Sequence, residues 1–356
     1  MNATFDPSAI TIEDVRIGDA ATVAEVDAWV LSQPDSTPFH RPAWIFAVAR
    51  GNGQRAILLV ARDVTGAIVG VLPLVLIRSA LFGRALVSSG FAVDGGILAT
   101  NSRAETALAD TCWALAQAHG CSTAELRGGS APEGWTVKAD AYLGFAKPLE
   151  ASDEAQLLSI PRRHRAEVRK SLENGLSFEM GRDKRLRDIH YRLYAASVHR
   201  LGTPVFPRAM FEHVLDDFGD AADIALVTKD GVPLSSVVSL YHHDAVMPYW
   251  HGATLASRAE RSNEFLYFNL MNASRERGLA RFDFGRSKVG TGPAAWKKTW
   301  GLEGVPLSYA VRAVEGKMPR DVNPLSPQYV RKVEMWKKLP LPVANMIGPW
   351  LARGLG

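Results

Sequence analysis

Residues 118–127 read Ala-His-Gly-Cys-Ser-Thr-Ala-Glu-Leu-Arg, and residues 276–285 read Glu-Arg-Gly-Leu-Ala-Arg-Phe-Asp-Phe-Gly. Each stretch ends a helical pattern at a glycine and continues into a β-rich run, so the two match element for element. Each also follows a series of short β-rich runs, at 56–62, 68–77 and 88–98 in the first half and at 223–229, 235–241 and 246–251 in the second. The pattern predicts an α/β fold (an α+β mixed sheet) made of two copies of one unit.

The length and composition set the class of protein. A chain of 356 residues is too long for one ordinary core, and 47% apolar with 22% charged residues is typical of a soluble globular protein. We expect a first domain at 1–150, a second at 151–312 and a proline-rich, then amphipathic tail at 313–356. The net charge of +4 says little about partners, because 41 basic residues are offset by 37 acidic ones.

The sequence argues against membrane-spanning and secreted classes. The longest apolar run, 67–77, is about half the length that crosses a bilayer, and residues 1–7 lack a secretory signal. We expect a cytoplasmic protein with Cys112 and Cys121 reduced, a disulfide being the alternative. The apolar end of the tail is interpreted as docking on the domain, and a peripheral contact with the inner membrane is the alternative.

A basic, glycine-rich stretch follows the second of the two quoted strands. Residues 282–301 read Phe-Asp-Phe-Gly-Arg-Ser-Lys-Val-Gly-Thr-Gly-Pro-Ala-Ala-Trp-Lys-Lys-Thr-Trp-Gly. The glycines let the backbone turn, and a helix capped by Thr291 with Pro293 in its first turn would present its positive end there. We therefore predict an anion site, with a solvated basic loop as the alternative. The residues expected to bind substrate or phosphate are Arg286, Ser287, Lys288, Gly290, Thr291, Gly292 and Lys298.

A second group of cations precedes the second copy. On a helix that begins near Pro161, the side chains of Arg162, Arg165 and Arg169 fall on one face. This face is either solvated or in contact with phosphate.

The turn before the helix of the second copy carries further candidates. Asn263 or Ser262 is expected to cap a helix that begins near Glu264, with Arg258 and Arg261 close by. His251 ends the preceding strand and either lines the pocket or packs in the core. The adjacent histidines at 242–243 should point to opposite faces of a hairpin, so we predict no metal site there.

Several segments together resemble the FemAB-like proteins, and most closely the subgroup associated with exosortase/PEP-CTERM exopolysaccharide loci. The likeness is strongest from residue 161 to residue 309. The segments that carry it are 161–170 (Pro-Arg-Arg-His-Arg-Ala-Glu-Val-Arg-Lys), 201–207 (Leu-Gly-Thr-Pro-Val-Phe-Pro), 258–263, 282–301, 323–327 (Asn-Pro-Leu-Ser-Pro) and 344–349 (Ala-Asn-Met-Ile-Gly-Pro).

The resemblance implies tandem duplicated GNAT-like N-acyltransferase domains that transfer an acyl or aminoacyl group to an amine. Trp296-Lys297 looks like the family's aromatic-lysine pair, whose lysine is tied to catalysis. The better-known FemABX peptidyltransferases use aminoacyl-tRNA, but a long helical arm for tRNA is not evident in this sequence. Ordinary GNAT enzymes hold acyl-CoA on a glycine-bearing turn, and the corresponding residues 254–263 contain no glycine. The donor is left open between aminoacyl-tRNA and acyl-CoA.

An amine that attacks an ester or thioester forms an oxyanion and must lose a proton. We assign oxyanion stabilisation to Lys297 and proton acceptance to Asp283, for which an ion pair with Arg286 or a lysine of the same loop is the alternative.

The predicted protein is therefore a transferase that forms an amide without a metal. Its acceptor would be an amine of a cell-envelope or exopolysaccharide precursor, that is, a phosphorylated, nucleotide-linked or lipid-linked glycan or peptide. The alternatives are an acyl-CoA-dependent GNAT N-acyltransferase and a non-catalytic GNAT-fold protein that binds a phosphorylated glycan precursor. We expect one site, formed mainly by the second copy.

Overall fold

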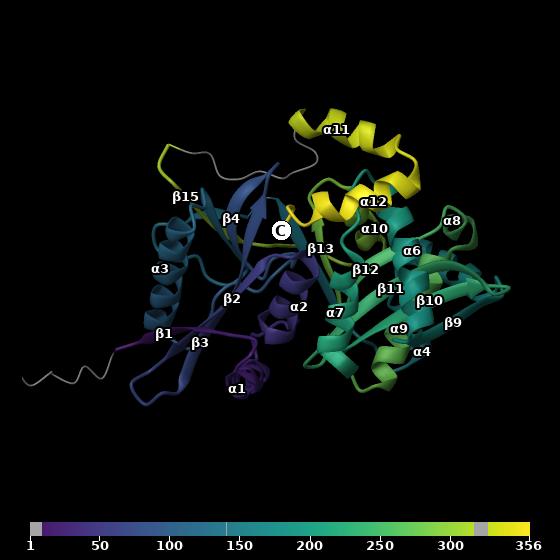
Figure 1. Ribbon diagram of the computed structural model, residues 1–356. Coiled ribbons are helices and arrows are strands. Elements are labelled where there is room, and N and C mark those ends of the chain that lie inside the picture. The colour runs from purple at the N-terminus through teal and green to yellow at the C-terminus, as the bar shows by residue number, and fades with distance from the viewer. Residues whose placement is uncertain (1–8, 140, 317–326) are drawn as a thin grey trace, which may run out of the picture.

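Two mixed sheets form the body of the molecule (Figure 1). The structure is a computed structural model that describes residues 9–139, 141–316 and 327–356. The first sheet has the order β1-β2-β3-β4-β6-β15-β7, with β5 paired to β3, and the second has the order β14-β8-β13-β12-β11-β10-β9. The predicted α/β architecture with a duplicated unit is confirmed.

The first sheet is covered on both faces, and its strands are therefore apolar on both faces. Leu58 and Val60 of β2 belong to one core cluster, while the alternate residues Ile57 and Leu59 belong to another. Both cysteines are buried and unbridged. The strands are β1 (Thr11–Val15), β2 (Arg55–Arg62), β3 (Ile68–Ser79), β4 (Gly83–Ser88), β5 (Leu98–Ala99), β6 (Thr123–Arg127) and β7 (Thr136–Lys138), and the helices are α1 (Ala20–Ser32), η1 (Pro38–His40, a 3-10 turn), α2 (Pro42–Asn52) and α3 (Ser102–Ala118).

The second unit repeats the meander, helix and returning strand. The predicted hairpin turn is present, because Asp230 and Gly231 have φ of 50° and 77°. Its strands are β8 (Tyr142–Pro148), β9 (Leu176–Gly181), β10 (Ala222–Lys229), β11 (Val232–His242), β12 (Ala245–Ala253), β13 (Arg281–Lys288), β14 (Val305–Pro306) and β15 (Tyr309–Ala313). Its helices are α4 (Asp153–Leu158), α5 (Arg162–Leu172), α6 (Lys184–Arg200), α7 (Arg208–Phe218), η2 (Gly219–Ala221, a 3-10 turn), α8 (Ser257–Glu260), α9 (Ser262–Glu276) and α10 (Gly292–Thr299).

The two halves exchange a strand. β8 lies within the predicted first domain but pairs antiparallel with β13 in the second sheet. β15 lies at the end of the predicted second domain but pairs with β6 in the first sheet. Neither half of the chain therefore completes its sheet without a strand from the other.

In each sheet one pair of parallel strands diverges. β4 and β6 pair only from Ala85↔Thr123 to Val87↔Glu125, and β12 and β13 pair only at Ala245↔Arg281 and Val246↔Phe282. The prediction of a β region over 88–98 is wrong for its middle, because residues 89–97 form a loop between β4 and β5. Ser89 and Phe91 of this loop have φ of 40° and 66°, which a strand cannot accommodate.

The adjacent histidines do not point to opposite faces, contrary to the prediction, although the turn expected there is present at residues 243–244. The Nε2 atoms of His242 and His243 both lie within hydrogen-bond distance of the Ser36 hydroxyl, at 2.8 and 2.9 Å. β11 ends at His242, and His243 has a φ of 50°, so the alternation of a strand does not continue through the pair.

The predicted cap of α9 differs from the observed one. The helix begins at Ser262, and its N-cap residue is Arg261, which has a φ of 54° and makes no side-chain capping bond. Asn263 therefore lies inside the first turn and is not the cap.

The C-terminal tail docks on the second unit, as the sequence predicts. It forms α11 (Pro327–Lys337) and α12 (Leu341–Ala352), both of which contact α6 (Figure 1). Gly348 packs closely on Val205, and Trp336 is buried. The proline-rich stretch 319–327 lies outside the described residues except for Pro327. Within the described part of the chain, no helix is both long and apolar enough to cross a bilayer.

α2 of the first unit packs against α7 of the second so closely that there is no room for a side chain at Gly51. A Cβ on Gly51 would lie 2.4 Å from the Cα of Met210 and 2.6 Å from its backbone nitrogen. The glycine therefore allows the two helices to approach closely, and this contact joins the two halves.

We expect Gly51→Ala to lower the free energy of unfolding by about 2 kcal/mol, because the new methyl group meets backbone atoms that cannot move aside. Helix propensity alone predicts the opposite sign, a gain of about 1 kcal/mol. Urea denaturation measures the difference. Gly292→Ala is the matched control, since a Cβ in the first turn of α10 meets no atom within 4 Å. A Gly51→Ala protein as stable as the parent would contradict the close contact.

Candidate functional site

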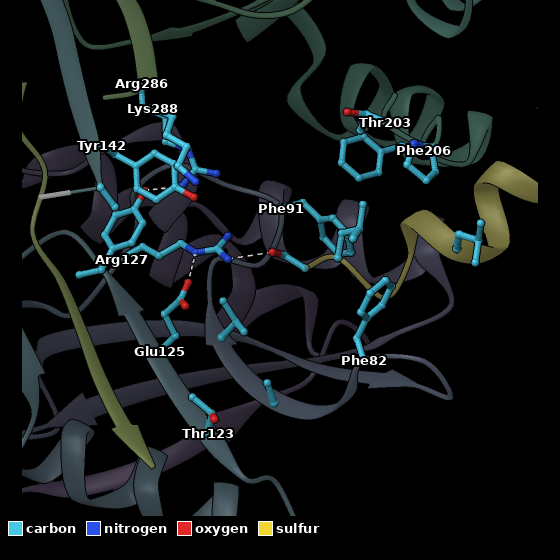
Figure 2. A pocket seen from close by; sticks show the side chains of 18 of the residues that line it. Phe82, Phe91, Thr123, Glu125, Arg127, Tyr142, Thr203, Phe206, Arg286 and Lys288 are labelled. Carbon is cyan, nitrogen blue, oxygen red and sulfur yellow. Dashed lines mark hydrogen bonds and ion pairs between the residues drawn. The ribbon is translucent and has the colours of Figure 1, made fainter. Parts of the chain in front are cut away.

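A cavity of about 590 Å³ lies between the two sheets. Strands of both sheets line it: β4, β6 and β15 of the first and β8 and β13 of the second. Three further segments complete the lining, namely the loop that precedes α7, the helix α11 and the end of α12. Figure 2 shows basic and tyrosine side chains on one side of the cavity and phenylalanines on the other. The cavity thus combines a cationic wall with an apolar one.

A β-bulge in β13 directs Arg286 and Lys288 into the cavity. The register of β13 against β8 shifts between Asp283 and Gly285, and Gly285 has a φ of 65°. Phe282 and Phe284 before the bulge pack in the core, whereas residues 286 and 288 after it line the cavity. In a regular strand all four side chains would share one face.

The Arg286 guanidinium is held between two tyrosines. It lies 4.3 Å from the ring centroid of Tyr142 and 5.7 Å from that of Tyr309, and its Nη1 donates a hydrogen bond to the Tyr309 hydroxyl. Within the described residues, no salt bridge includes Arg286. The side chain is fixed in direction and has no carboxylate partner there.

Arg127, at the end of β6, lines the same cavity but has its charge matched. Its Nε donates to Glu125 (2.7 Å), its Nη1 to the carbonyl of Ala92 (2.9 Å) and its Nη2 to the carbonyl of Gly356 (2.8 Å). Arg127 is only 6% exposed, and its three partners lie on β6, on the loop 89–97 and at the C-terminus. We therefore interpret it as a structural residue that connects these segments.

The opposite wall is apolar. Phe91 and Phe206 pack edge to face with ring centroids 5.6 Å apart, and Phe82 lies beside them in Figure 2. Trp336 of α11 and Leu351 of α12 complete this wall. A cavity of this kind suits a ligand that has both an anionic group and an apolar part.

Lys297 lies behind the cationic wall. Its Nζ donates to the carbonyls of Gly285 (3.0 Å) and Arg286 (2.9 Å), and only 8% of the residue is exposed. Burial lowers the pKa of the Lys297 ammonium to about 8, although the Asp283 carboxylate acts in the opposite direction. As far as the chain is described, the cavity-lining residues do not include Lys297. Its contacts stabilise the bulge that positions Arg286.

Two carboxyl groups, one from each unit, lie close to this region. Burial raises the pKa of Asp283, whose Oδ1 accepts the backbone N–H of Gly285 (2.7 Å). Burial also raises the pKa of Asp94 to about 6, and the charge of Asp283 adds to this shift. Within the described part of the chain, Asp283 has no ion pair with Arg286 or a lysine.

The remaining predicted residues lie away from the cavity. Thr291 is the N-cap residue of α10, but its hydroxyl donates to the carbonyl of Lys288 and makes no capping bond. Ser287 is buried, and its hydroxyl has no hydrogen-bond partner within the described chain. Gly290, Gly292 and Lys298 are exposed.

The cations of α5 do not reach the cavity either. Arg162 and Arg169 are exposed, and Arg165 donates to the carbonyl of Ile160 (3.0 Å). Arg258 is exposed on α8, while His251 is hydrogen-bonded to Asn263 (3.0 Å). Burial lowers the pKa of His251 to about 4, as expected for a packed, neutral imidazole.

Several cavity residues were missed from the sequence. Arg127 could have been found, because it ends β6 in the first copy as the basic Lys288 ends β13 in the second. Tyr142, Phe206 and Tyr309 carry no local signal, since each comes from a segment whose position depends on the fold of the whole chain.

The comparison with known proteins is consistent with this architecture. Residues 160–298 match the family described as Acetyltransferase (GNAT) domain. The structure of FemX is similar with a TM-score of 0.66 and 17% identity, over 84% of this chain and 96% of FemX. The tandem GNAT protein of the clavulanic acid biosynthesis pathway is similar with a TM-score of 0.57 and 13% identity, over 87% of this chain and 100% of that one.

A third similar structure is the C-terminal domain of a putative lysylphosphatidylglycerol synthetase from Agrobacterium fabrum. Its TM-score is 0.54 at 16% identity, over 83% of this chain and 93% of that one. No curated protein matches the sequence. At these identities the likeness establishes the fold, which is that of two GNAT-like units in tandem.

The pKa of Lys297 predicts a pH-dependent stability. The ammonium has a pKa of about 8 in the folded protein and its ordinary pKa of 10.5 in the unfolded chain, so between these pH values the unfolded chain binds more protons. Because the buried Lys297 ammonium loses its proton above pH 8, its burial no longer destabilises the fold, and the free energy of unfolding rises between pH 8 and pH 10.5. The free energy of unfolding of the parent, minus that of Lys297→Met, should rise by up to about 3 kcal/mol.

Chemical denaturation at pH 8 and pH 10.5 measures this difference. Lys298→Met is the matched control, because its side chain is exposed, and it should give a much smaller change. A difference that is independent of pH for Lys297→Met would contradict a buried ammonium.

Proposed function

We propose that the chain is an N-acyl- or aminoacyltransferase whose substrate carries an anionic group and an apolar part, and that transfer takes place at the cavity between the sheets. The observation that carries the proposal is Arg286, a cavity-lining guanidinium stacked on Tyr142 that has no carboxylate partner in the described chain. An arginine held in this way can bind a carboxylate or a phosphate through two parallel N–H···O hydrogen bonds.

The match of residues 160–298 with the GNAT domain supports the reaction class. The matched range contains β12, α9 and β13, and the parallel pair within it diverges beyond Val246 and Phe282. Beyond this point β13 lines the cavity through Arg286 and Lys288, so a substrate bound there would lie against the second half of the matched range.

In the proposed reaction the amine nitrogen attacks the acyl carbon, the carbon–oxygen or carbon–sulfur bond to the donor breaks, and the amine loses a proton. Arg286 holds the anionic group of the substrate. Lys297 keeps the bulge in place through the carbonyls of Gly285 and Arg286. Its direct role at the oxyanion, and that of Asp283 as proton acceptor, stay predictions.

The resemblance over residues 161–309 supports a finer proposal. We place the chain with the FemAB-like proteins and, within them, with the exosortase/PEP-CTERM-associated subgroup. The acceptor would then be an amine on a phosphorylated, nucleotide-linked or lipid-linked precursor of the cell envelope or of an exopolysaccharide. Both aminoacyl-tRNA and acyl-CoA are retained as donors.

A second candidate is a non-catalytic binding protein. It is favoured by one observation: Lys297, the residue that the resemblance ties to catalysis, has its ammonium bound to two backbone carbonyls. In this case the cavity would hold the anionic precursor without any transfer.

Arg286→Gln tests the site. With purified protein, acetyl-CoA or charged tRNA as donor and an amino-sugar nucleotide as acceptor, mass spectrometry of the acceptor should show a mass gain. We expect the substitution to lower kcat/KM about 10- to 100-fold, because it removes a charge-assisted contact.

Arg312→Gln is the matched control. Arg312 also stacks on an aromatic ring, that of Trp113 at 4.9 Å, but it lies on β15 outside the residues that line the cavity. Equal activity of Arg286→Gln and the parent would remove Arg286 from the site. Acceptor binding that depends on Arg286, without product from either donor, would favour the binding protein.

A further inference from the structure

α12 presents an apolar face to solvent. Its twelve residues include no charged side chain. Val343, Met346 and Trp350, spaced three and four residues apart, are 39%, 74% and 54% exposed. The opposite face packs against the body of the protein through Ala344, Gly348 and Ala352. A helix on a water-exposed surface normally has the reverse arrangement, with polar side chains outward.

α11 and the turn after it, which directly precede α12 in the chain, carry exposed positive charge. Residues 327–356 contain five basic residues and one acidic residue, Glu334, which is paired with Lys337. Arg331 and Lys338 are exposed, and Met335 between them is 70% exposed. Exposed apolar and cationic side chains therefore occur on two consecutive helices that both contact α6.

We propose that α11 and α12 dock on the surface of a membrane that contains anionic lipids. The side chains of Met346 and Trp350 enter the boundary between headgroups and acyl chains, where tryptophan is favoured. Arg331 and Lys338 bind the lipid phosphates, and each cation near an anionic surface contributes about 1 kcal/mol.

A second copy of the chain fits this surface less well. A two-fold contact places the same patch of each copy against the other, so it would bring together the net positive charge of two copies of α11. An anionic bilayer accepts both the apolar side chains and the positive charge. This complementarity favours the membrane over a dimer.

Docking in this way brings the cavity next to the bilayer. Val333 and Trp336 of α11 and Leu351 of α12 line the cavity, while other residues of the same helices form the docking surface. An amphiphilic anion in the membrane would then lie close to the helices that wall the cavity of Arg286. This consequence rests on the proposed function, whereas the docking itself does not.

Vesicle flotation with the full chain tests the docking. The vesicles are made of phosphatidylcholine with or without phosphatidylglycerol. We expect binding only with phosphatidylglycerol, and a loss of at least about tenfold in partitioning for the double variant Met346→Ser/Trp350→Ser. Its control is Leu255→Ser, which removes a residue that is 79% exposed between β12 and α8.

The charge is tested by Arg331→Gln/Lys338→Gln, which should abolish the preference for phosphatidylglycerol. Arg103→Gln/Lys184→Gln removes two exposed cations elsewhere and should retain that preference. Absence of binding to either vesicle overturns the proposal. So does a dimer, seen by light scattering, that Met346→Ser/Trp350→Ser dissociates, because the face then belongs to a second copy. Neither result depends on whether the chain transfers an acyl group.

Discussion

The arrangement of the site depends on four consecutive backbone carbonyls, those of residues 90–93. Each accepts a hydrogen bond from a side chain of a different element: Trp44 of α2 (3.2 Å), Tyr249 of β12 (2.8 Å), Arg127 of β6 (2.9 Å) and Tyr309 of β15 (2.8 Å). A buried carbonyl left without a partner costs more than such a bond contributes, so the loop and the two sheets fix one another. The left-handed Ser89 and Phe91 are held by this set of contacts.

The same loop also positions the cationic wall of the cavity, through Tyr309. The Tyr309 hydroxyl that donates to Val93 also accepts from Arg286, so the guanidinium is placed by the first unit although it belongs to the second. On its other side, Lys297 binds the carbonyls at the bulge of β13. A buried ammonium is costly, and here two carbonyl acceptors and the nearby Asp283 offset part of that cost.

The exchange of β8 and β15 explains why the cavity draws on both units. Tyr142 and Tyr309, the two rings around Arg286, lie on these two strands. In the first unit, the space beyond the parallel pair is occupied by its own loop, since Gly128 leaves room for Asp94 where a Cβ would lie 1.9 Å from Oδ1. This gives a physical reason to expect one site, and the cavity that is its candidate is lined by residues of both units.

The duplicated α/β unit, the Asp230-Gly231 turn and the docking of the tail follow from local patterns: a glycine that ends a helix, a run that alternates, an apolar stretch that needs cover. Local patterns also predicted Arg286 and Lys288 as candidates, because a basic stretch after a strand is visible in the sequence.

Local patterns could not predict the direction of each side chain. One extra residue in β13 turns Arg286 from the core face to the cavity, and residues more than a hundred positions apart, such as Tyr142 and Tyr309, meet only after the sheets have exchanged strands. The periodicity of the sequence determined which helices and strands form. The bulge in β13 and the exchange of β8 and β15 depend on pairing between distant segments, and they determined which side chains meet at the cavity.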